Sequence, residues 1–148
     1  MVWGCVSAAG IGNLEFIEGN MDKWSYLNIL KTPLKNSAQK LGLLDSFMFY
    51  GDNDPKHASR IAQEWLLYNC PKVIHTPAQS LDLNIIEHVW RELKLQVNKR
   101  EKSSKDQLKA TIRAAWENIQ PSFLEKLVRS MPRRLQAVIN NNGYPTNY

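Results

Sequence analysis

Cysteine is scarce in this chain of 148 residues, which contains only Cys5 and Cys70. Two thiols cannot form the disulfide framework of a small secreted domain, and no Asn-x-Ser/Thr glycosylation sequon occurs. No apolar run approaches the length of a membrane span, and the chain has no internal repeat. These absences favour a globular protein of a reducing, intracellular compartment over a disulfide-rich or membrane-spanning one.

The excess of positive charge is concentrated in one segment. The net charge is +5, and residues 91–109 contain seven Lys or Arg against three Asp or Glu. A basic stripe of this kind attracts a phosphate backbone by releasing counterions. A solvated helix end and loop explains the same charge without any partner, and on charge alone this simpler interpretation is favoured.

Residue patterns predict an α/β chain with a mixed sheet. β-forming residues on both sides of the glycines in "AAGIG" predict a hairpin, and "SFMFY" is so continuously apolar that it predicts a fully buried strand. The expected strands lie near residues 1–7, 13–18, 46–50 and 72–75.

Helical spacing of apolar residues predicts the remaining elements. The expected helices cover residues 21–41, where Pro33 divides or kinks the helix, residues 57–69, and residues 86–97, and two or three more helices close the chain. Capping patterns begin at Ser103 and Ser122, and Pro121 and Pro132 are suited to helix starts. The tryptophans on expected apolar faces, which should pack in cores, are Trp24, Trp65, Trp90 and Trp116.

Two acidic residues are placed where they could hold a cation. Asp52 follows the "SFMFY" strand, at the edge of the sheet where ligands gather in α/β folds. Glu87 lies in the first turn of the helix containing Trp90, where we expect it at the boundary of the buried surface. Carboxylates on different elements can bind Mg²⁺ or Mn²⁺.

Each acid also has a purely local interpretation. The stretch 52–55 is typical of a turn and helix cap, and Glu87 suits a first helical turn or an ion pair with Arg91. A calcium loop is excluded because His57 and Gln63 occupy the positions that require glycine and glutamate. His57 could act as a base or ligand but more often packs at a helix start. The residues expected to be structural are His75, His88, Cys5 and Cys70.

Three blocks of the sequence resemble successive blocks of the Tc branch of the Tc/mariner transposases. They are "MVWGCVSAAGIGNLEFIEG", "GDNDPKHASRIAQEWL" and "TPAQSLDLNIIEHVWRELK", and the resemblance runs from Met1 to about Lys99. The family pattern reads approximately VMVWGCFSA-x-G-x-G-x-L-x-FIEG, then QDNDPKHTS, then PAQSPDLNPIEHVWRELK. The 35 positions from Asp52 to Glu87 match the separation of the second and third catalytic acids in this branch.

The resemblance implies an RNase H-like catalytic core, in which three acids hold two divalent cations, Mg²⁺ or Mn²⁺, for in-line displacement at a DNA phosphate. Asp52 and Glu87 correspond to the second and third acids, as catalytic residues and metal ligands. The supporting motif residues that carry over are Asn53, Pro55, Lys56, His57, Pro77, Gln79, Ser80, Asp82, Leu83 and Asn84. The residues that gain a DNA-facing role are Arg91, Lys94, Lys99, Arg100 and Lys102.

The sequence also departs from the family pattern. The first acid of the family lies upstream of the block that begins here at Met1, and Asp22 and Asp45 are expected in a helix or loop. The expected fold is therefore an incomplete RNase H-like mixed sheet flanked by helices, without its first, central strand, and with a helical C-terminal tail. Smaller departures are Gly51 in place of glutamine, and Leu81 and Ile85 in place of prolines.

We therefore expect residues 1–99 to form a partial catalytic core, residues 100–142 a helical extension of the same domain, and residues 143–148 a frayed tail. The family implies transposon-end DNA as partner, assembly with a second copy or a full-length transposase, and a nuclear location. With two acids of three and no N-terminal DNA-binding domain, the chain alone is expected to be inactive. The alternative is a non-catalytic fragment that binds DNA or joins a transposase multimer.

Overall fold

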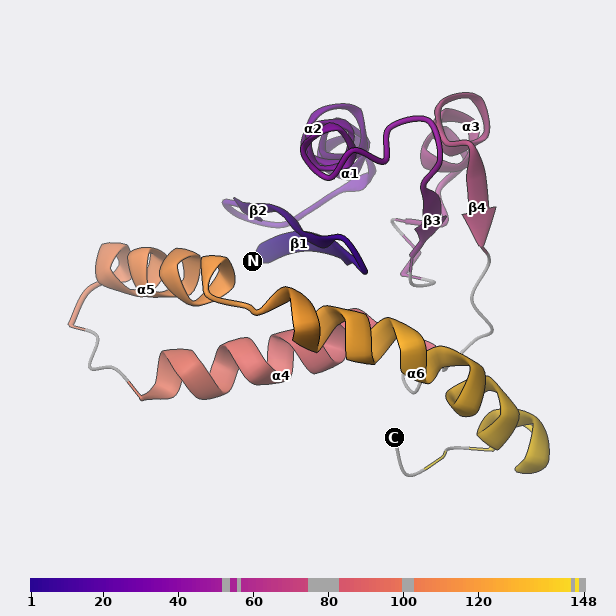
Figure 1. Ribbon diagram of the computed structural model, residues 1–148. Coiled ribbons are helices and arrows are strands. Elements are labelled where there is room, and N and C mark those ends of the chain that lie inside the picture. The colour runs from indigo at the N-terminus through magenta and orange to yellow at the C-terminus, as the bar shows by residue number, and fades with distance from the viewer. Residues whose placement is uncertain (52–53, 56, 75–82, 100–102, 145, 147–148) are drawn as a thin grey trace. The chain divides into compact units, whose positions relative to one another are not determined.

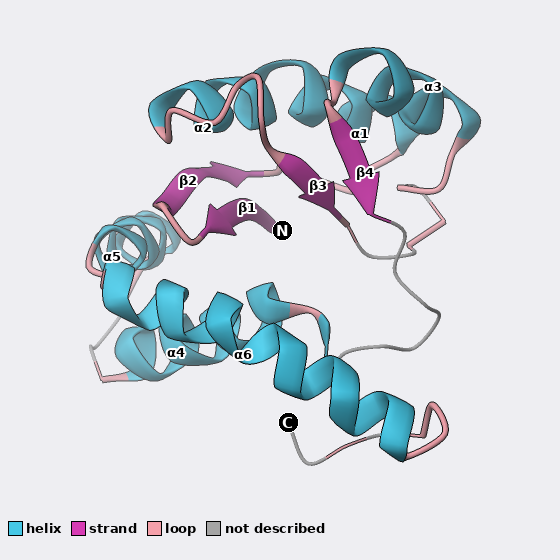
Figure 2. Ribbon diagram, turned by 45° about the vertical axis from the view of Figure 1, so that its right-hand side comes forward, coloured by secondary structure: helices cyan, strands magenta, loops and turns pink. Residues whose placement is uncertain are grey.

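The computed structural model describes the chain except residues 52–53, 56, 75–82, 100–102, 145 and 147–148. Figure 1 labels the helices and strands along the chain, and Figure 2 distinguishes the two kinds of element by colour. None of the described helices is long and apolar enough to cross a membrane. The chain divides into two compact units, of which the first comprises Met1–Cys5 and Gly12–Gln79 and the second comprises Val6–Ile11 and Ser80–Tyr148.

The predicted hairpin is present as β1 (Val2–Ser7) and β2 (Gly10–Phe16). Its turn is shorter than expected, because Gly10 and Gly12 belong to β2 and only residues 8–9 form the turn. Gly12 is required by packing: a Cβ there would lie 2.5 Å from the Sγ of Cys5 and 2.7 Å from the Cβ of Ser37. The hairpin and the helix that carries Ser37 therefore approach each other too closely for any side chain at Gly12.

The helical segment after the hairpin runs through Pro33 without stopping. It consists of α1 (Lys23–Ile29), the π-helical turn η1 (Leu30–Leu34) and α2 (Lys35–Lys40). Proline has no N–H to donate, and the wider π turn accommodates the missing bond. The Ser37 hydroxyl, buried in this segment, donates to the Pro33 carbonyl at 2.6 Å and accepts from the Asn13 N–H at 2.8 Å. This serine thus ties the helical segment to β2.

A β-α-β unit completes the first unit. Strands β3 (Met48–Tyr50) and β4 (Lys72–Ile74) pair in parallel, with Phe49 opposite Val73, and α3 (Arg60–Asn69) connects them. Parallel neighbours require such a crossover. The prediction that β3 is fully buried is wrong: Met48 is 58% exposed, since β3 pairs with β4 in a sheet of only two strands among the described residues.

Helices supply the core of the first unit, and strand residues pack against it. The most deeply buried side chains come from the α1–η1 segment and α3, and they include Tyr26, Leu30, Ala62 and Leu66. The strand and loop residues against this cluster are Trp3, Cys5, Ile17, Phe47, Phe49 and Val73. The described strands form two separate two-stranded sheets, β1–β2 and β3–β4, so the α/β class with a small, incomplete sheet is confirmed, but these strands do not join into one mixed sheet.

Trp24 does not pack in this core. Its side chain is 56% exposed in the first turn of α1, with the Lys23 ammonium 5.6 Å from the ring centroid. Tyr26, only 2% exposed, fills the core at this end of the helix instead. The prediction that Trp24 is a core residue is therefore wrong.

Apart from the hairpin tip, the elements that the structure describes in the second unit are helices. It contains α4 (Ile85–Asn98), α5 (Lys105–Glu117) and α6 (Pro121–Asn140). The predicted apolar stripe of α4 is confirmed, since Val89, Leu93 and Val97 are buried. Trp90 and Trp116 stack at 5.3 Å between ring centroids and join α4 to α5.

Three details of the C-terminal helices differ from the sequence predictions. The N-cap of α5 is Ser104, whose Oγ accepts the Gln107 N–H at 3.1 Å, so the predicted cap at Ser103 is one residue too early. Helix α6 starts at Pro121, as predicted, but Ser122 lies inside it and does not cap it. Pro132 also lies inside α6, because the buried face of this 20-residue helix continues through it.

Candidate active site and nucleic-acid interface

The turn after β3 is held by packing from two helices. The Asp54 carbonyl accepts from the His57 and Ala58 N–H groups at 2.8 and 2.9 Å, and Pro55 is exposed in this turn. The His57 ring stacks on Tyr26 of α1 at 3.9 Å between centroids, and Gln63 of α3 donates to the His57 carbonyl at 3.2 Å. The candidate residues Asp52, Asn53 and Lys56 lie outside the described residues.

Glu87 lies in the first turn of α4, as predicted, and its side chain is exposed. Its N–H donates to the carbonyl of the N-cap Asn84 at 3.2 Å. The expected place at the boundary of the buried surface is wrong, because Glu87 precedes the fully buried Val89 by two residues, and 200° of helical rotation separates them. Between Glu87 and Arg91, both among the described residues, no ion pair forms.

Leu83 and Asn84 directly precede α4 and are among the described residues. Leu83 is buried at 3% exposure and precedes the half-buried N-cap Asn84. Ile85 is the first residue of α4, the N1 position that favours proline, which is the residue in the family pattern. The candidates outside the described residues are His75, Pro77, Gln79, Ser80 and Asp82.

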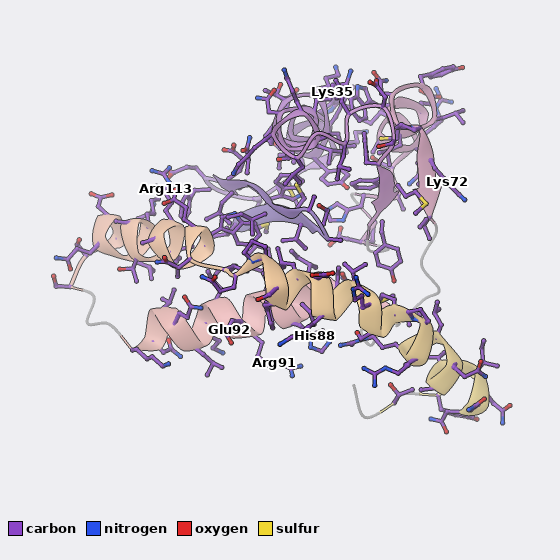
Figure 3. All side chains as sticks on the ribbon, in the orientation of Figure 1. Lys35, Lys72, His88, Arg91, Glu92 and Arg113 are labelled. Atoms are coloured by element: carbon purple, nitrogen blue, oxygen red, sulfur yellow. The ribbon has the colours of Figure 1, made fainter. Side chains whose placement is uncertain are left out.

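A buried arginine next to this turn was missed by the sequence analysis. Arg134 of α6 is 5% exposed, and its Nη1 lies 2.7 Å from Nε2 of His88, the residue after Glu87. Figure 3 labels His88 together with Arg91 and Glu92 of the same helix. Its Nε donates to the Ser130 hydroxyl at 2.7 Å. The available signal was the position of Arg134 seven residues after Leu127, on the same apolar stripe of α6.

The basic residues predicted to face DNA are exposed where the structure describes them. Arg91 and Lys94 project from α4 and Lys99 follows its end, whereas Arg100 and Lys102 lie outside the described residues. Glu92 of the same helix accepts a hydrogen bond from Gln96 at 3.0 Å. These cations are therefore available to an anionic partner.

Thiol chemistry is disfavoured at both cysteines. Burial raises the pKa of Cys5, and burial raises the pKa of Cys70 to about 11. The thiolate, which is the nucleophile and soft-metal ligand, is therefore scarce near neutral pH. This agrees with the expectation that both cysteines are structural.

The donor chemistry at Glu87 suits a hard cation. An exposed carboxylate supplies the oxygen ligands that Mg²⁺ and Mn²⁺ prefer. Within the part of the chain that the structure describes, no three His, Cys, Asp or Glu residues are grouped as a metal site.

Fold and motifs together define a class of protein. The chain belongs to the DDE superfamily endonucleases, whose family model matches residues 1–109. It is 40% identical over 148 residues to the transposable element Tcb1 transposase of Caenorhabditis briggsae, and 41% identical over 149 residues to the Tc1 transposase of Caenorhabditis elegans. Both alignments cover 100% of this chain but only 54% of the relative, so the chain spans about half the length of these relatives. The resemblance to the Tc branch is therefore confirmed.

Solved structures identify the fold. The catalytic domain of Mos1 transposase with Raltegravir and Mn superposes with a TM-score of 0.88 at 16% identity, over 99% of this chain and 76% of that one. The Mos1 mariner paired end complex with Mn gives a TM-score of 0.89 at the same identity, covering 99% of this chain and 44% of that one. The predicted RNase H-like class is therefore confirmed.

Proposed function

We propose that this chain is part of the catalytic core of a DNA transposase that cuts and joins DNA with two divalent cations. The observation that carries the proposal is the family match over residues 1–109, which contains Asp52, Glu87 and the basic segment 91–109. Relatives named Tc1 and Tcb1 transposases support the same substrate, transposon DNA in the nucleus. In this proposal residues 1–99 belong to the core and residues 100–142 extend the same domain.

Each part of the chain has a chemical role in this proposal. Bound Mg²⁺ or Mn²⁺ would activate the attacking oxygen and stabilise the leaving oxygen at the phosphate. The Asp52 and Glu87 carboxylates would hold these cations. Exposed cations such as Arg91, Lys94 and Lys99 would neutralise the DNA backbone and orient it.

We further propose that these 148 residues do not cut DNA by themselves. Residues 1–51 are all described, and their aspartates are Asp22 and Asp45. Asp22 caps α1 by accepting the Ser25 N–H at 2.7 Å, and Asp45 lies in an exposed turn. Neither lies on a strand, where the family pattern has its first acid, so two catalytic acids would have to hold the metals without the third.

A nicking assay on supercoiled DNA with Mg²⁺ or Mn²⁺ tests both statements. The expected result is no metal-dependent nicking by the 148-residue chain. Cleavage that disappears in Asp52→Asn and Glu87→Gln, but survives in Glu92→Gln on the same helix, would show an active chain and overturn the second statement. If these 148 residues, extended upstream by a strand that carries an aspartate, also fail to cut, the catalytic proposal fails.

A non-catalytic DNA-binding fragment is the second candidate, and the exposed basic residues of α4 favour it. Double charge reversal, Lys99→Glu with Arg100→Glu, should weaken a DNA mobility shift and lower the slope of log affinity against log salt by about two, because each phosphate contact contributes about 0.9. The matched control, Lys31→Glu with Lys40→Glu, reverses two exposed lysines of the first unit and should change little. If the unmodified chain gives no shift at low salt, this candidate fails.

A further inference from the structure

Arg134 lies outside the residues that the family model matches, yet it is among the most buried charged groups described in the chain. It is 5% exposed in α6, whereas its neighbour Arg133 is exposed. Burying a guanidinium is unfavourable unless its donors are satisfied. An apolar residue would fill the same place on the stripe without this requirement, so packing alone does not explain an arginine here.

The contacts of Arg134 form a directed chain of hydrogen bonds. The Ser130 hydroxyl donates to the Leu127 carbonyl at 2.6 Å and accepts from the Arg134 Nε at 2.7 Å. At the other end of the guanidinium, Nη1 lies 2.7 Å from Nε2 of His88. Because a guanidinium can only donate, Nε2 of His88 must be the acceptor, and the ring proton must be on Nδ1.

The partner of Arg134 immediately follows the candidate metal ligand. His88 and Glu87 are consecutive residues in the first turn of α4, and Val89 after them is fully buried. The burial of Val89 holds this turn against the core. Apolar packing has no preferred direction, however, so it constrains rotation of the turn less than a hydrogen bond does. The bond from Arg134 to His88 adds that directional constraint.

We propose that Arg134 is a positioning residue, which fixes the first turn of α4 through His88 and so sets the direction of the Glu87 carboxylate. The importance of that direction rests on the proposed function, in which Glu87 binds a cation. The mechanical part of the inference, the effect of Arg134 on the turn, stands without any metal.

The first experiment examines the whole chain without metal. Long-range ¹⁵N–¹H correlation spectra should show Nε2 of His88 unprotonated, and Arg134→Met should remove this signature. The Glu87 amide, bonded to the Asn84 carbonyl at 3.2 Å, should exchange with solvent about tenfold faster in that variant. Arg133→Met is the matched control and should change neither readout. Unchanged spectra and exchange in Arg134→Met would overturn the proposal.

Partial rescue separates positioning from general damage. Arg134→Lys retains the positive charge and a single donor nitrogen, and should restore part of the Glu87 amide protection that Arg134→Met loses. If Arg134→Met unfolds the chain, His88→Asn and His88→Leu are compared instead, since an asparagine carbonyl can accept the same bond and a leucine cannot. Equal exchange at Glu87 in these two variants would also overturn the proposal.

A second experiment adds Mn²⁺ and measures paramagnetic broadening of the Glu87 amide signal. We expect broadening in the unmodified chain and in Arg133→Met, and a several-fold higher Mn²⁺ concentration for the same broadening in Arg134→Met. If the unmodified chain shows none, the proposed metal role of Glu87 fails, while the metal-free spectra still decide whether Arg134 positions the turn. If broadening is equal in both arginine variants, the effect of Arg134 on the carboxylate is refuted.

Discussion

The two compact units differ sharply in charge although they are similar in length. Met1–Cys5 with Gly12–Gln79 contains seven Lys or Arg and seven Asp or Glu, so its net charge is zero. Val6–Ile11 with Ser80–Tyr148 contains twelve basic residues and seven acidic ones, which accounts for the whole net charge of +5. Net charge informs on partners more than on fold, so under the proposed function the second unit is the one expected to contact DNA.

The units also differ in how they bury apolar surface. In the first, two short sheets and a π-interrupted helical segment share a cluster around Tyr26 and Leu30. In the second, three helices bury continuous stripes, with Trp90 and Trp116 stacked. The apolar residues of a helical stripe all come from one segment of sequence, whereas a sheet needs strands from distant segments. The first unit should therefore be the more sensitive to the loss of a partner strand.

The largest expected effect comes from emptying one core at a time. Leu30→Ala in the first unit and Leu124→Ala in the second each remove a side chain that is at most 1% exposed, and each should lower the free energy of unfolding by about 2–5 kcal/mol. Residue-resolved hydrogen exchange should show the loss of protection mainly in the unit that carries the substitution.

Leu67→Ala is the control for that experiment, because Leu67 is 73% exposed and its loss should change stability by less than about 0.5 kcal/mol. Equal loss of protection in both units after Leu30→Ala would contradict the comparison. The chain would then unfold as one cooperative body, and the division into units would describe contacts without describing stability.

The features that the sequence predicted well are those with a local physical cause. The α4 stripe needed only helical periodicity, and Pro121 at the start of α6 needed only its missing N–H. The cap of α5 was misplaced by one residue because the prediction paired Ser103 with Asp106, whereas Ser104 with Gln107 fits the Ser-x-x-Gln capping pattern, and the Gln107 N–H donates to the Ser104 hydroxyl. Boundaries of this kind depend on which neighbouring side chain reaches the free N–H group.

The features that failed depend on distant parts of the chain. The apolar run of β3 does not reveal that Met48 remains 58% exposed, because that depends on which strands pair beside it. Trp24 has helical spacing with core residues, but its side chain is 56% exposed in the first turn of α1, where Tyr26 and Leu27 are buried instead. The sequence alone suggests that Arg134 is a surface charge, because its hydrogen-bond partners Ser130 and His88 are identified only in the structure.

The candidate site also contains both local features and features that depend on distant residues. Helical periodicity placed Glu87 in the first turn of α4, and the structure agrees with that placement; family resemblance added its role as a catalytic acid. Its exposure could have been predicted from the same helical periodicity, because two residues of helical rotation separate Glu87 from the buried Val89. The pairing of Glu87 with Asp52 remains a proposal, because Asp52 lies outside the described residues.

The smallest expected effect compares an exposed ion pair in each unit. Arg60 and Glu64 of α3 approach to 3.2 Å, and Glu125 and Arg129 of α6 to 2.8 Å, both at i,i+4 spacing. A pair with the acid on the N-terminal side opposes the helix dipole less, so Arg129→Met should lower the free energy of unfolding by about 0.3–0.5 kcal/mol and Arg60→Met by less. Methionine has nearly the helix propensity of arginine, so the difference reports the pair. Urea denaturation at low and high salt measures it: the Arg129 effect should shrink with salt, and a larger effect for Arg60→Met would show that local geometry outweighs pair orientation.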